Sequence, residues 1–464
     1  MDACAGWAPD VAIAVVVALA IGLIAGHVLP DYDATYALIW GSDIFHGRNP
    51  DYSLPFRPAG HPLTTLVGVI GAPFGREGAA ELLRWVALLG AGAFVASAFR
   101  LGRVLFGTAA GVVVALLLFT RSPLWGFSEL AFMDAWAAAF VVWAAALEAR
   151  TPRRGAPVFV LLALAGLLRP EVWVFAVAYW VWIAIGSRSR ALRLIPLAAL
   201  APLVWIAWDL ATAHSFLGSV STSEGLPVAT SAGGHGLGRV PDALARFIGG
   251  FMRPPEAAAA VAGAAMLALA AGGRAARPAT RLAVPAGRVA IPVALVALNV
   301  ITFAIVAYRK GPLEQRYLLV AAGVLLVLSA YAIARGAPRP LGWLLALACL
   351  AYAPVDVARL GDVRAQVRTA DAVYSDLRDV IETRAGRCTL SGYVHVPDVR
   401  LRPLVAYWGG IPPARVGTDA RGSADVVALN ALARELSSRS LPADPDASPP
   451  RGRSWRLAGP CARQ

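Results

Sequence analysis

Residues 11–29 read VAIAVVVALAIGLIAGHVL, and residues 30–33, which follow directly, read PDYD. The first stretch is almost wholly apolar and long enough to cross about 30 Å of hydrocarbon at about 1.5 Å per residue. Comparable runs recur as far as Pro354, and they do not alternate as the strands of a membrane β-barrel would. The sequence therefore predicts a helical membrane protein with many spans.

The overall composition excludes a soluble globular protein. Of 464 residues, 58% are hydrophobic and 15% charged, and the mean hydropathy is +0.61, whereas about a quarter of the residues of a soluble domain are charged. The net charge of +13 would suggest a nucleic-acid partner in a soluble protein. Here 27 basic and 18 acidic residues precede residue 361, and 15 basic and 11 acidic residues follow it. The excess of positive charge lies mainly between apolar runs, and we therefore expect no nucleic-acid partner.

Arginine residues gather in short segments between the apolar runs, which is typical of cytoplasmic loops. The groups are Arg100/Arg103, Arg150/Arg153/Arg154, Arg188/Arg190/Arg193, Arg274/Arg277/Arg281 and Arg335/Arg339. With these loops inside, we expect about eleven spans and a C-terminus on the outer side. The expected spans are 11–29, 79–99, 106–121, 133–149, 156–168, 171–186, 194–212, 255–272, 288–307, 317–334 and 340–355. The first lacks a preceding basic segment, and we expect it to be retained.

Two long stretches on the outer side, within residues 29–76 and 214–254, are too long for simple turns. In the first, Ala34–Phe45 and Leu63–Phe74 predict helices that lie in the membrane interface. The second contains a Gly/Ser-rich tract, which is either a mobile lid or an ordinary surface loop, and then a short helix over Pro241–Phe251.

From Gly361 onward the composition becomes that of a small soluble α/β unit. Helical spacing covers Val363–Arg384 and Ala424–Leu441, and Thr389–Val396 alternates as a strand. Cys388 and Cys461 are expected to form a disulfide, with two free thiols as the alternative. The predicted fold class is an all-α polytopic membrane domain over residues 1–355 with an extracytoplasmic α/β domain over residues 356–464.

Two carboxylates, Asp31 and Asp33, follow the first span directly. At the margin of the membrane a carboxylate is partly desolvated, which raises its pKa toward that of a working general base. The alternative is that one of them only caps the helix expected over Ala34–Phe45. The residues themselves leave both interpretations open.

The order of motifs around this pair resembles the start of the GT-C superfamily of membrane glycosyltransferases. A span is followed by an acidic pair with Tyr36, an interfacial helix, the motif Arg57-Pro58-x-x-His61-Pro62-Leu63, and an apolar stretch that ends Phe74-Gly75. Such enzymes, among them the lipid A aminoarabinose transferase and actinobacterial mannosyl- and arabinosyltransferases, move a sugar from a polyprenyl-phosphate carrier to an acceptor. The resemblance implies that the acid near the first span is the base. Asp33 fits that position better than Asp31, although Asp-x-Asp differs from the adjacent Asp-Glu of relatives.

Further residues match positions of the family pattern. Glu129 and Asp134 flank the outer end of the fourth span, and Arg169-Pro170-Glu171 follows the fifth. The resemblance implies a catalytic role for Asp134 and substrate contacts for the others, together with Arg57 and His61. The alternatives are helix capping for the first two, an internal ion pair at a kink for Arg169 and Glu171, and a satisfied interfacial histidine for His61.

The outer segment that begins at Tyr308 reads YRKGPLEQRYLL. Its cations Arg309, Lys310 and Arg316 lie outside, against the usual bias, and Arg316-Tyr317 before an apolar run is a recurrent element of the family. These residues would bind the phosphate of a polyprenyl carrier. Contact with ordinary lipid headgroups is the alternative.

The expected function is that of an inverting glycosyltransferase in the cytoplasmic membrane, with its site on the outer face. The donor would be a polyprenyl-phosphate sugar and the acceptor a glycan, lipid or protein, without a metal or cofactor. A flippase for lipid-linked glycans and a non-enzymatic scaffold with an outer cap are the alternatives. The sequence leaves the sugar, the acceptor and the oligomeric state open.

Overall fold

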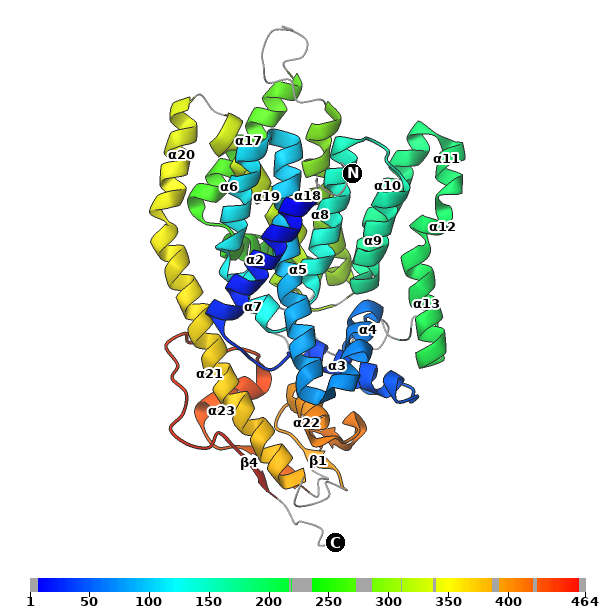
Figure 1. Ribbon diagram of the computed structural model, residues 1–464, viewed down its shortest axis with the longest axis vertical. Coiled ribbons are helices and arrows are strands. Elements are labelled where there is room, and N and C mark those ends of the chain that lie inside the picture. The colour runs from blue at the N-terminus through cyan, green and yellow to red at the C-terminus, as the bar shows by residue number, and fades with distance from the viewer. Residues whose placement is uncertain are drawn as a thin grey trace.

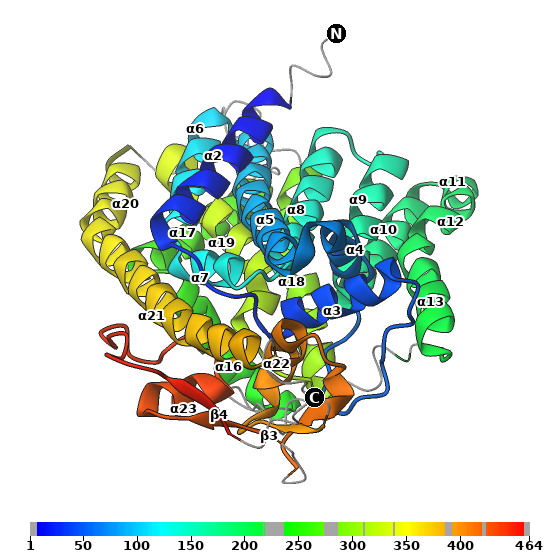
Figure 2. The same cartoon turned by 60° about the horizontal axis from the view of Figure 1, so that its bottom comes forward.

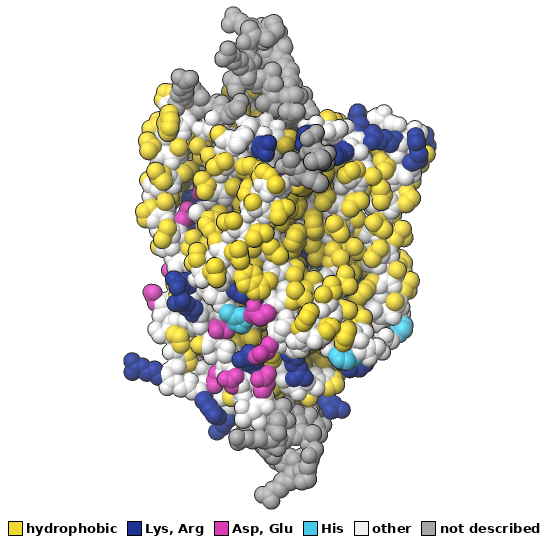
Figure 3. Space-filling model, viewed as in Figure 1, with side chains coloured by type: hydrophobic (Ala, Val, Ile, Leu, Met, Phe, Trp, Pro, Cys, Tyr) yellow, Lys and Arg dark blue, Asp and Glu magenta, His cyan; other side chains and the backbone are white. Residues whose placement is uncertain are grey.

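The computed structural model describes residues 7–216, 218, 236–272, 286–309, 311–336, 339–385, 392–419 and 424–458. Most of its helices run along the long axis of the molecule, and a small sheet lies at one end (Figure 1). The C-terminal ends of α5 (Gly75–Phe106), α8 (Asp134–Arg150) and α10 (Trp173–Gly186), in or near which many of the arginine residues lie, are at the opposite end. A belt of hydrophobic side chains separates two zones of charge on the face in Figure 3, as expected of a protein that crosses a membrane.

A helix lies within each predicted span. These helices are α2 (Ala8–Ala25), α5 (Gly75–Phe106), α6 (Thr108–Phe119), α8 (Asp134–Arg150), α9 (Ala156–Leu168), α10 (Trp173–Gly186), α13 (Leu200–Ala213), α17 (Pro254–Gly272), α18 (Ala286–Tyr308), α19 (Leu319–Tyr331) and α20 (Arg339–Ala351). In the described part of the chain, four helical segments are long and apolar enough to cross a membrane alone, or five with one bent pair. Five further apolar helices are shorter, so the count of eleven spans stays a prediction.

Two breaks interrupt the helices of the bundle. The predicted span 194–212 is wrong as a single helix, because α12 (Ile195–Ala198) and α13 occupy it. Pro202 lacks the N–H group that would donate to the Ala198 carbonyl and continue the helix past Ala199. The second break bends α6 by 61° against α7 (Ser122–Glu129), and Arg121 lies buried at the bend.

The two helices predicted in the first outer loop are confirmed. They are α3 (Tyr32–Phe45) and α4 (Pro62–Gly71), which η1 (Ala72–Phe74) continues. They cross closely, because a Cβ added to Gly41 would lie 2.4 Å from the carbonyl carbon of Gly68. Both helices lie between the bundle and the C-terminal sheet (Figure 1). The short helix predicted over Pro241–Phe251 is confirmed as α16 (Val240–Phe251).

The C-terminal part consists of a long helix, a four-stranded sheet and two short helices. Helix α21 (Ala353–Ala385) continues unbroken across residues 355 and 356, and the domain boundary placed there stays a prediction. The sheet order is β2-β1-β3-β4, with β3 parallel to β1 and antiparallel to β4. The bounds are β1 (Val394–His395), β2 (Val416–Gly417), β3 (Ala424–Ala428), β4 (Trp455–Ala458), α22 (Arg402–Gly409) and α23 (Ala431–Ser438).

The helix predicted over Ala424–Leu441 is wrong in its first part, which forms strand β3. Val426 and Val427 are β-branched and favour a strand, and Asn430 then starts α23 by accepting a hydrogen bond from the Ala433 N–H at 2.7 Å. The predicted strand over Thr389–Val396 is described only in its second half, as β1.

The C-terminal part shares one hydrophobic core with the first outer loop. Tyr32, Tyr36 and Trp40 of α3 belong to the same buried cluster as Leu404 and Trp408 of α22. Figure 2 shows α22 beside α3. The sheet-containing end is thus packed onto the loop that carries the acidic pair.

Candidate active site

The N-terminus of α3 separates the two acidic residues of the first outer loop. Asp31 is the N-cap residue, and its backbone N–H donates to the carbonyl of Leu130 at 3.1 Å. The helix begins at Tyr32, earlier than predicted, so Asp33 lies within its first turn. The two side chains take different directions. Asp31 contacts Ser440 and Arg400 of the C-terminal part, and Asp33 contacts Arg316.

Arg316 joins three carboxylates that come from different parts of the chain. It lies in η6 (Gln315–Leu318), and its side chain is 6% exposed. Its Nη2 is 3.1 Å from Asp33 Oδ2, its Nη1 is 3.6 Å from Asp134 Oδ2, and its Nε is 2.6 Å from Glu314 Oε2. Its guanidinium carbon also lies 3.9 Å from the ring centre of Phe132. A single buried cation therefore connects α3, α8 and η6.

A second cation, Arg169, completes this group. It follows α9 and precedes η2 (Pro170–Val172), and it forms an ion pair with Asp134. Its guanidinium lies over the ring of Tyr317, 4.6 Å from the ring centre. We call Asp33, Asp134, Arg169, Glu314 and Arg316 the site cluster. It contains three carboxylates and two guanidinium groups.

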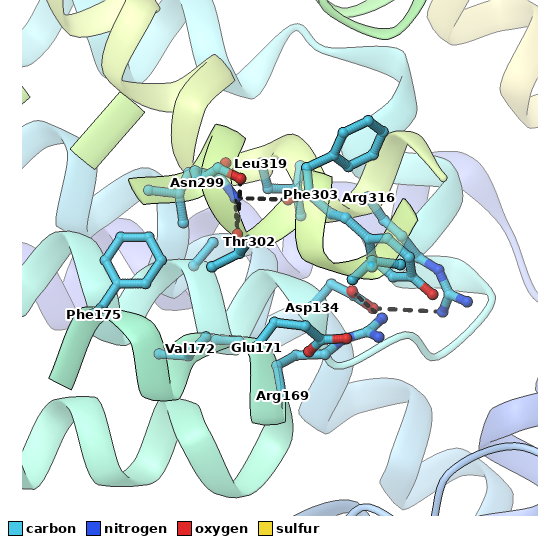
Figure 4. A pocket seen from close by; sticks show the side chains of 15 residues that line it. Asp134, Arg169, Glu171, Val172, Phe175, Asn299, Thr302, Phe303, Arg316 and Leu319 are labelled. Carbon is cyan, nitrogen blue, oxygen red and sulfur yellow. Dashed lines mark hydrogen bonds and ion pairs between the residues drawn. The ribbon is translucent and has the colours of Figure 1, made fainter. Parts of the chain in front are cut away.

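The site cluster borders a pocket between α8, α10, α18 and α19 (Figure 4). The pocket has about 480 Å³ of empty space, its open mouth included. One side is polar, with Asp134, Arg169 and Arg316. The remaining lining is mostly apolar and comes from membrane helices, namely Ala137, Ala138, Val172, Phe175, Phe303, Val306, Leu319 and Val320. The pocket thus has charged groups on one side and apolar side chains on the other.

Charge in the site cluster controls the proton on Asp33. Burial raises the pKa of the Asp33 carboxyl, but the positive charge of Arg316, followed by that of Arg169, outweighs burial and lowers the pKa below its ordinary value. Asp33 is therefore ionised at neutral pH, as a proton acceptor must be, but the raised pKa expected of a carboxylate at the membrane margin is wrong for this residue, because the two guanidinium groups outweigh desolvation. Its side chain is 22% exposed, so a substrate can still reach it.

His61 lies next to the site cluster at the N-terminus of α4. Burial, with a smaller effect of Arg169, lowers its pKa to about 4, and the ring is neutral at pH 7. Its ring packs edge-on against Trp205 with centres 5.7 Å apart. Within the described residues no hydrogen bond reaches the buried His61 Nδ1. The same holds for the buried Oε2 of Glu171, which lines the pocket.

Other residues singled out from the sequence lie elsewhere. Glu129 is buried and accepts a hydrogen bond from Arg84 at 2.7 Å. Arg57 is buried and donates to the backbone carbonyls of Tyr52, Pro58 and Gly218. Arg309 is exposed just after α18. Lys310, Cys388, Cys461 and most of the Gly/Ser-rich tract lie outside the described residues.

The structure adds polar residues that sequence reasoning missed. Glu314 lies two residues before Arg316 in a segment already singled out, so its charge was a usable signal. Asn299 and Thr302 line the pocket from α18, and polar residues inside an apolar span are a general sign of function. Ser440 and Arg400 come from the C-terminal part and gave no signal of their own, because polar residues are ordinary in a soluble domain.

Comparisons of the sequence alone find no matching protein-family model and no matching curated protein. Comparisons of the structure do find relatives. ArnT from Cupriavidus metallidurans, solved with undecaprenyl phosphate, is 14% identical with a TM-score of 0.56, and the match covers 97% of each chain. The Archaeoglobus fulgidus oligosaccharyltransferase, solved with Zn and sulfate, is 13% identical with a TM-score of 0.51. That match covers 89% of this chain and 62% of the other, so this chain spans less than two thirds of it.

At such low identity these matches establish the fold and not the reaction. They extend over most of the chain. The apolar helices agree with a membrane location. The chain is thus a membrane protein with the GT-C fold.

Proposed function

We propose that the chain is an inverting glycosyltransferase of the cytoplasmic membrane that uses a polyprenyl-phosphate sugar as donor. The acceptor would be a glycan, lipid or protein reached from the outer face. The observation that carries the proposal is the meeting of Asp33, Arg316 and Arg169 beside an apolar pocket. ArnT, which shares the fold, was solved with a polyprenyl phosphate.

The pocket suits an amphiphilic donor. Its apolar lining, with Phe175, Phe303 and Val306, matches the first isoprene units of a carrier. Arg169 and Arg316 are the cations for the phosphate, because a guanidinium group can donate to two phosphate oxygens at once. A bound phosphate would compete with Asp33 and Asp134 for these two cations. The proposal therefore includes a rearrangement of ion pairs when the donor binds.

In the chemical step, Asp33 accepts the proton of an acceptor hydroxyl group. The hydroxyl oxygen forms a bond to the anomeric carbon, and the bond from that carbon to the phosphate oxygen breaks. The polyprenyl phosphate leaves with the electron pair, and one displacement inverts the anomeric centre. Arg316 and Arg169 stabilise the negative charge that grows on the leaving phosphate. With a monophosphate leaving group, we propose no further cofactor.

The sugar has two candidate contacts. His61 Nδ1 and Glu171 Oε2 are buried and have no hydrogen-bond partner within the described residues. A buried polar atom without a partner costs about 1–3 kcal/mol. A sugar whose hydroxyl or amino groups reach these atoms would remove that cost, so we propose both as donor-sugar ligands.

The test is sugar transfer by the full chain in lipid vesicles, with a panel of labelled polyprenyl-phosphate sugars. We expect Asp33→Asn to reduce the rate by about a hundredfold or more, because the substitution keeps the volume but removes the proton acceptor. Asp43→Asn is the matched control, since Asp43 lies on the same helix but pairs with the exposed Arg48. Full activity in both Asp33→Asn and Asp31→Asn would contradict the mechanism.

A further inference from the structure

We propose that the C-terminal part of the chain positions Asp33 and that Asp31, Ser440 and Arg400 are the positioning residues. The proposal rests on the proposed function of Asp33 as the base. It assigns a task to the described C-terminal residues 392–419 and 424–458, and it gives the two acidic residues of the first outer loop different roles. Asp33 acts on the substrate, and Asp31 holds the loop in place.

The contact between the two parts of the chain is a small polar triangle. Asp31 Oδ1 accepts a hydrogen bond from the Ser440 hydroxyl group, and Asp31 Oδ2 lies 3.7 Å from Arg400 Nη2. Arg400 Nη2 also donates to Ser440 Oγ at 3.3 Å. The Asp31 side chain is 8% exposed, so water replaces these partners poorly. Both carboxylate oxygens of Asp31 are thus occupied by the C-terminal part.

The backbone transmits this contact to Asp33. The carbonyl of Asp31 accepts hydrogen bonds from the N–H of Thr35 at 2.8 Å and from its hydroxyl group at 2.9 Å. Asp31 is therefore fixed as the start of α3, and Asp33 is the second residue of that helix. A change in the position of Asp31 moves Asp33 relative to Arg316. Displacements of about 1 Å at a reacting group can cost about a hundredfold in rate.

A second contact holds the other side of the first outer loop. Arg402 is buried, and it donates to the carbonyl of Pro55 at 2.8 Å and to that of Val416 at 2.8 Å. Tyr32 in turn donates to the carbonyl of Phe56 at 2.5 Å. The C-terminal part therefore contacts the first outer loop both before and after α3, and not at one point alone.

The surroundings of Asp31 differ from those of the site cluster. Asp31 lines a small cleft with Tyr32, Tyr374, Arg400 and Ser440. This cleft shares no lining residue with the pocket beside Arg316. A donor in the pocket would therefore contact Arg316, the partner of Asp33, and would not contact Asp31.

The test compares Ser440→Ala with Ser438→Ala in the full chain in vesicles. Ser438 is the matched control, because it is exposed and its hydroxyl donates only to the backbone of its own helix. We expect Ser440→Ala to lower kcat about tenfold with the donor KM changed by less than about twofold. Ser440→Thr keeps the hydroxyl group and is expected to restore kcat.

A pH profile separates positioning from a general loss of structure. Arg316, Arg169 and His61 face Asp33, and Arg400 lies near it as well. If Asp33 moves away from Arg316, its pKa rises, and the acid limb of kcat/KM shifts to higher pH in Ser440→Ala. A wild-type kcat and pH profile in Ser440→Ala, with Asp33→Asn inactive, would overturn this inference and leave the proposed function intact. Full activity in Asp33→Asn would instead overturn the proposed function itself.

Discussion

Two clusters of charged residues in the described part of the chain differ in composition. One is the site cluster, with three carboxylates and two guanidinium groups. The other, which we call the balanced cluster, consists of Arg121, Arg253, Glu256 and Asp356. Arg121 lies 2.8 Å from Glu256 and 2.6 Å from Asp356, and Arg253 lies 2.7 Å from Asp356. All four are at most 5% exposed.

The difference separates a structural cluster from a functional one. In the balanced cluster the charges are equal in number, and none of its members lines either pocket described above. It connects the bend between α6 and α7 to the starts of α17 and α21. The site cluster has an excess of carboxylates and opens onto a pocket. Charge that is enclosed and lines no cavity holds the fold, whereas charge beside a cavity is available to a substrate.

The largest expected effect concerns the balanced cluster. Asp356→Ala removes a carboxylate that contacts both arginine residues, and Arg253 Nη1 and Nη2 already lack partners within the described residues. We expect a loss of about 3–5 kcal/mol in the free energy of unfolding, because breaking a buried ion pair leaves an uncompensated charge. Thermal unfolding in detergent measures it. Asp362→Ala, on an exposed part of the same helix, is the control and should change little. Equal stability of both variants would contradict the structural role.

The next effect concerns the cation at the centre of the site cluster. Arg316→Gln should raise the donor KM by about tenfold, since each charge-assisted hydrogen bond contributes about 1.5–3 kcal/mol. The pH dependence changes as well. Burial still raises the pKa of Asp33, but the main charge that lowers it is gone, so the pKa rises. The acid limb of kcat/KM then moves to higher pH. An unchanged limb would mean that Arg316 does not control the proton on Asp33.

The smallest expected effect concerns His61. Its pKa in the folded chain is about 4, below its ordinary value of 6.5. As pH falls from about 6.5 toward 4, the unfolded chain gains a proton that the folded chain does not, and stability decreases. The melting temperature of His61→Gln should therefore fall less between pH 7 and pH 5 than that of the wild type. His46→Gln, at an exposed position, is the control. The same pH dependence in both variants would show that His61 does not contribute.

Four members of the site cluster, Asp33, Asp134, Arg169 and Arg316, were predicted from the sequence. They are charged residues at the ends of apolar runs, where a charge needs a reason, and they also match positions of the GT-C pattern. Glu129 is also a charged residue at the end of an apolar run, but it forms an ion pair with Arg84. Periodicity alone does not show which charged helix ends share a partner.

What the sequence did not predict depends on distant contacts. Ser440 is 409 residues from Asp31, and neither residue carries a pattern that points to the other. Arg121 and Asp356 are likewise far apart, and each could have been an ordinary loop charge. The strand over Ala424–Ala428 was assigned to a helix, because its partners β1 and β4 are set by tertiary pairing rather than by local spacing.

The most direct test measures the rate of sugar transfer per folded molecule in Asp33→Asn and in Asp356→Ala, with one polyprenyl-phosphate donor and one preparation of vesicles. We expect the transfer rate of Asp33→Asn to fall by about a hundredfold or more, while its melting temperature stays close to that of the wild type. We expect Asp356→Ala to melt at a lower temperature but to transfer sugar at close to the wild-type rate per folded molecule. A wild-type rate in Asp33→Asn together with an inactive but folded Asp356→Ala would show that the roles of the two clusters are wrongly assigned.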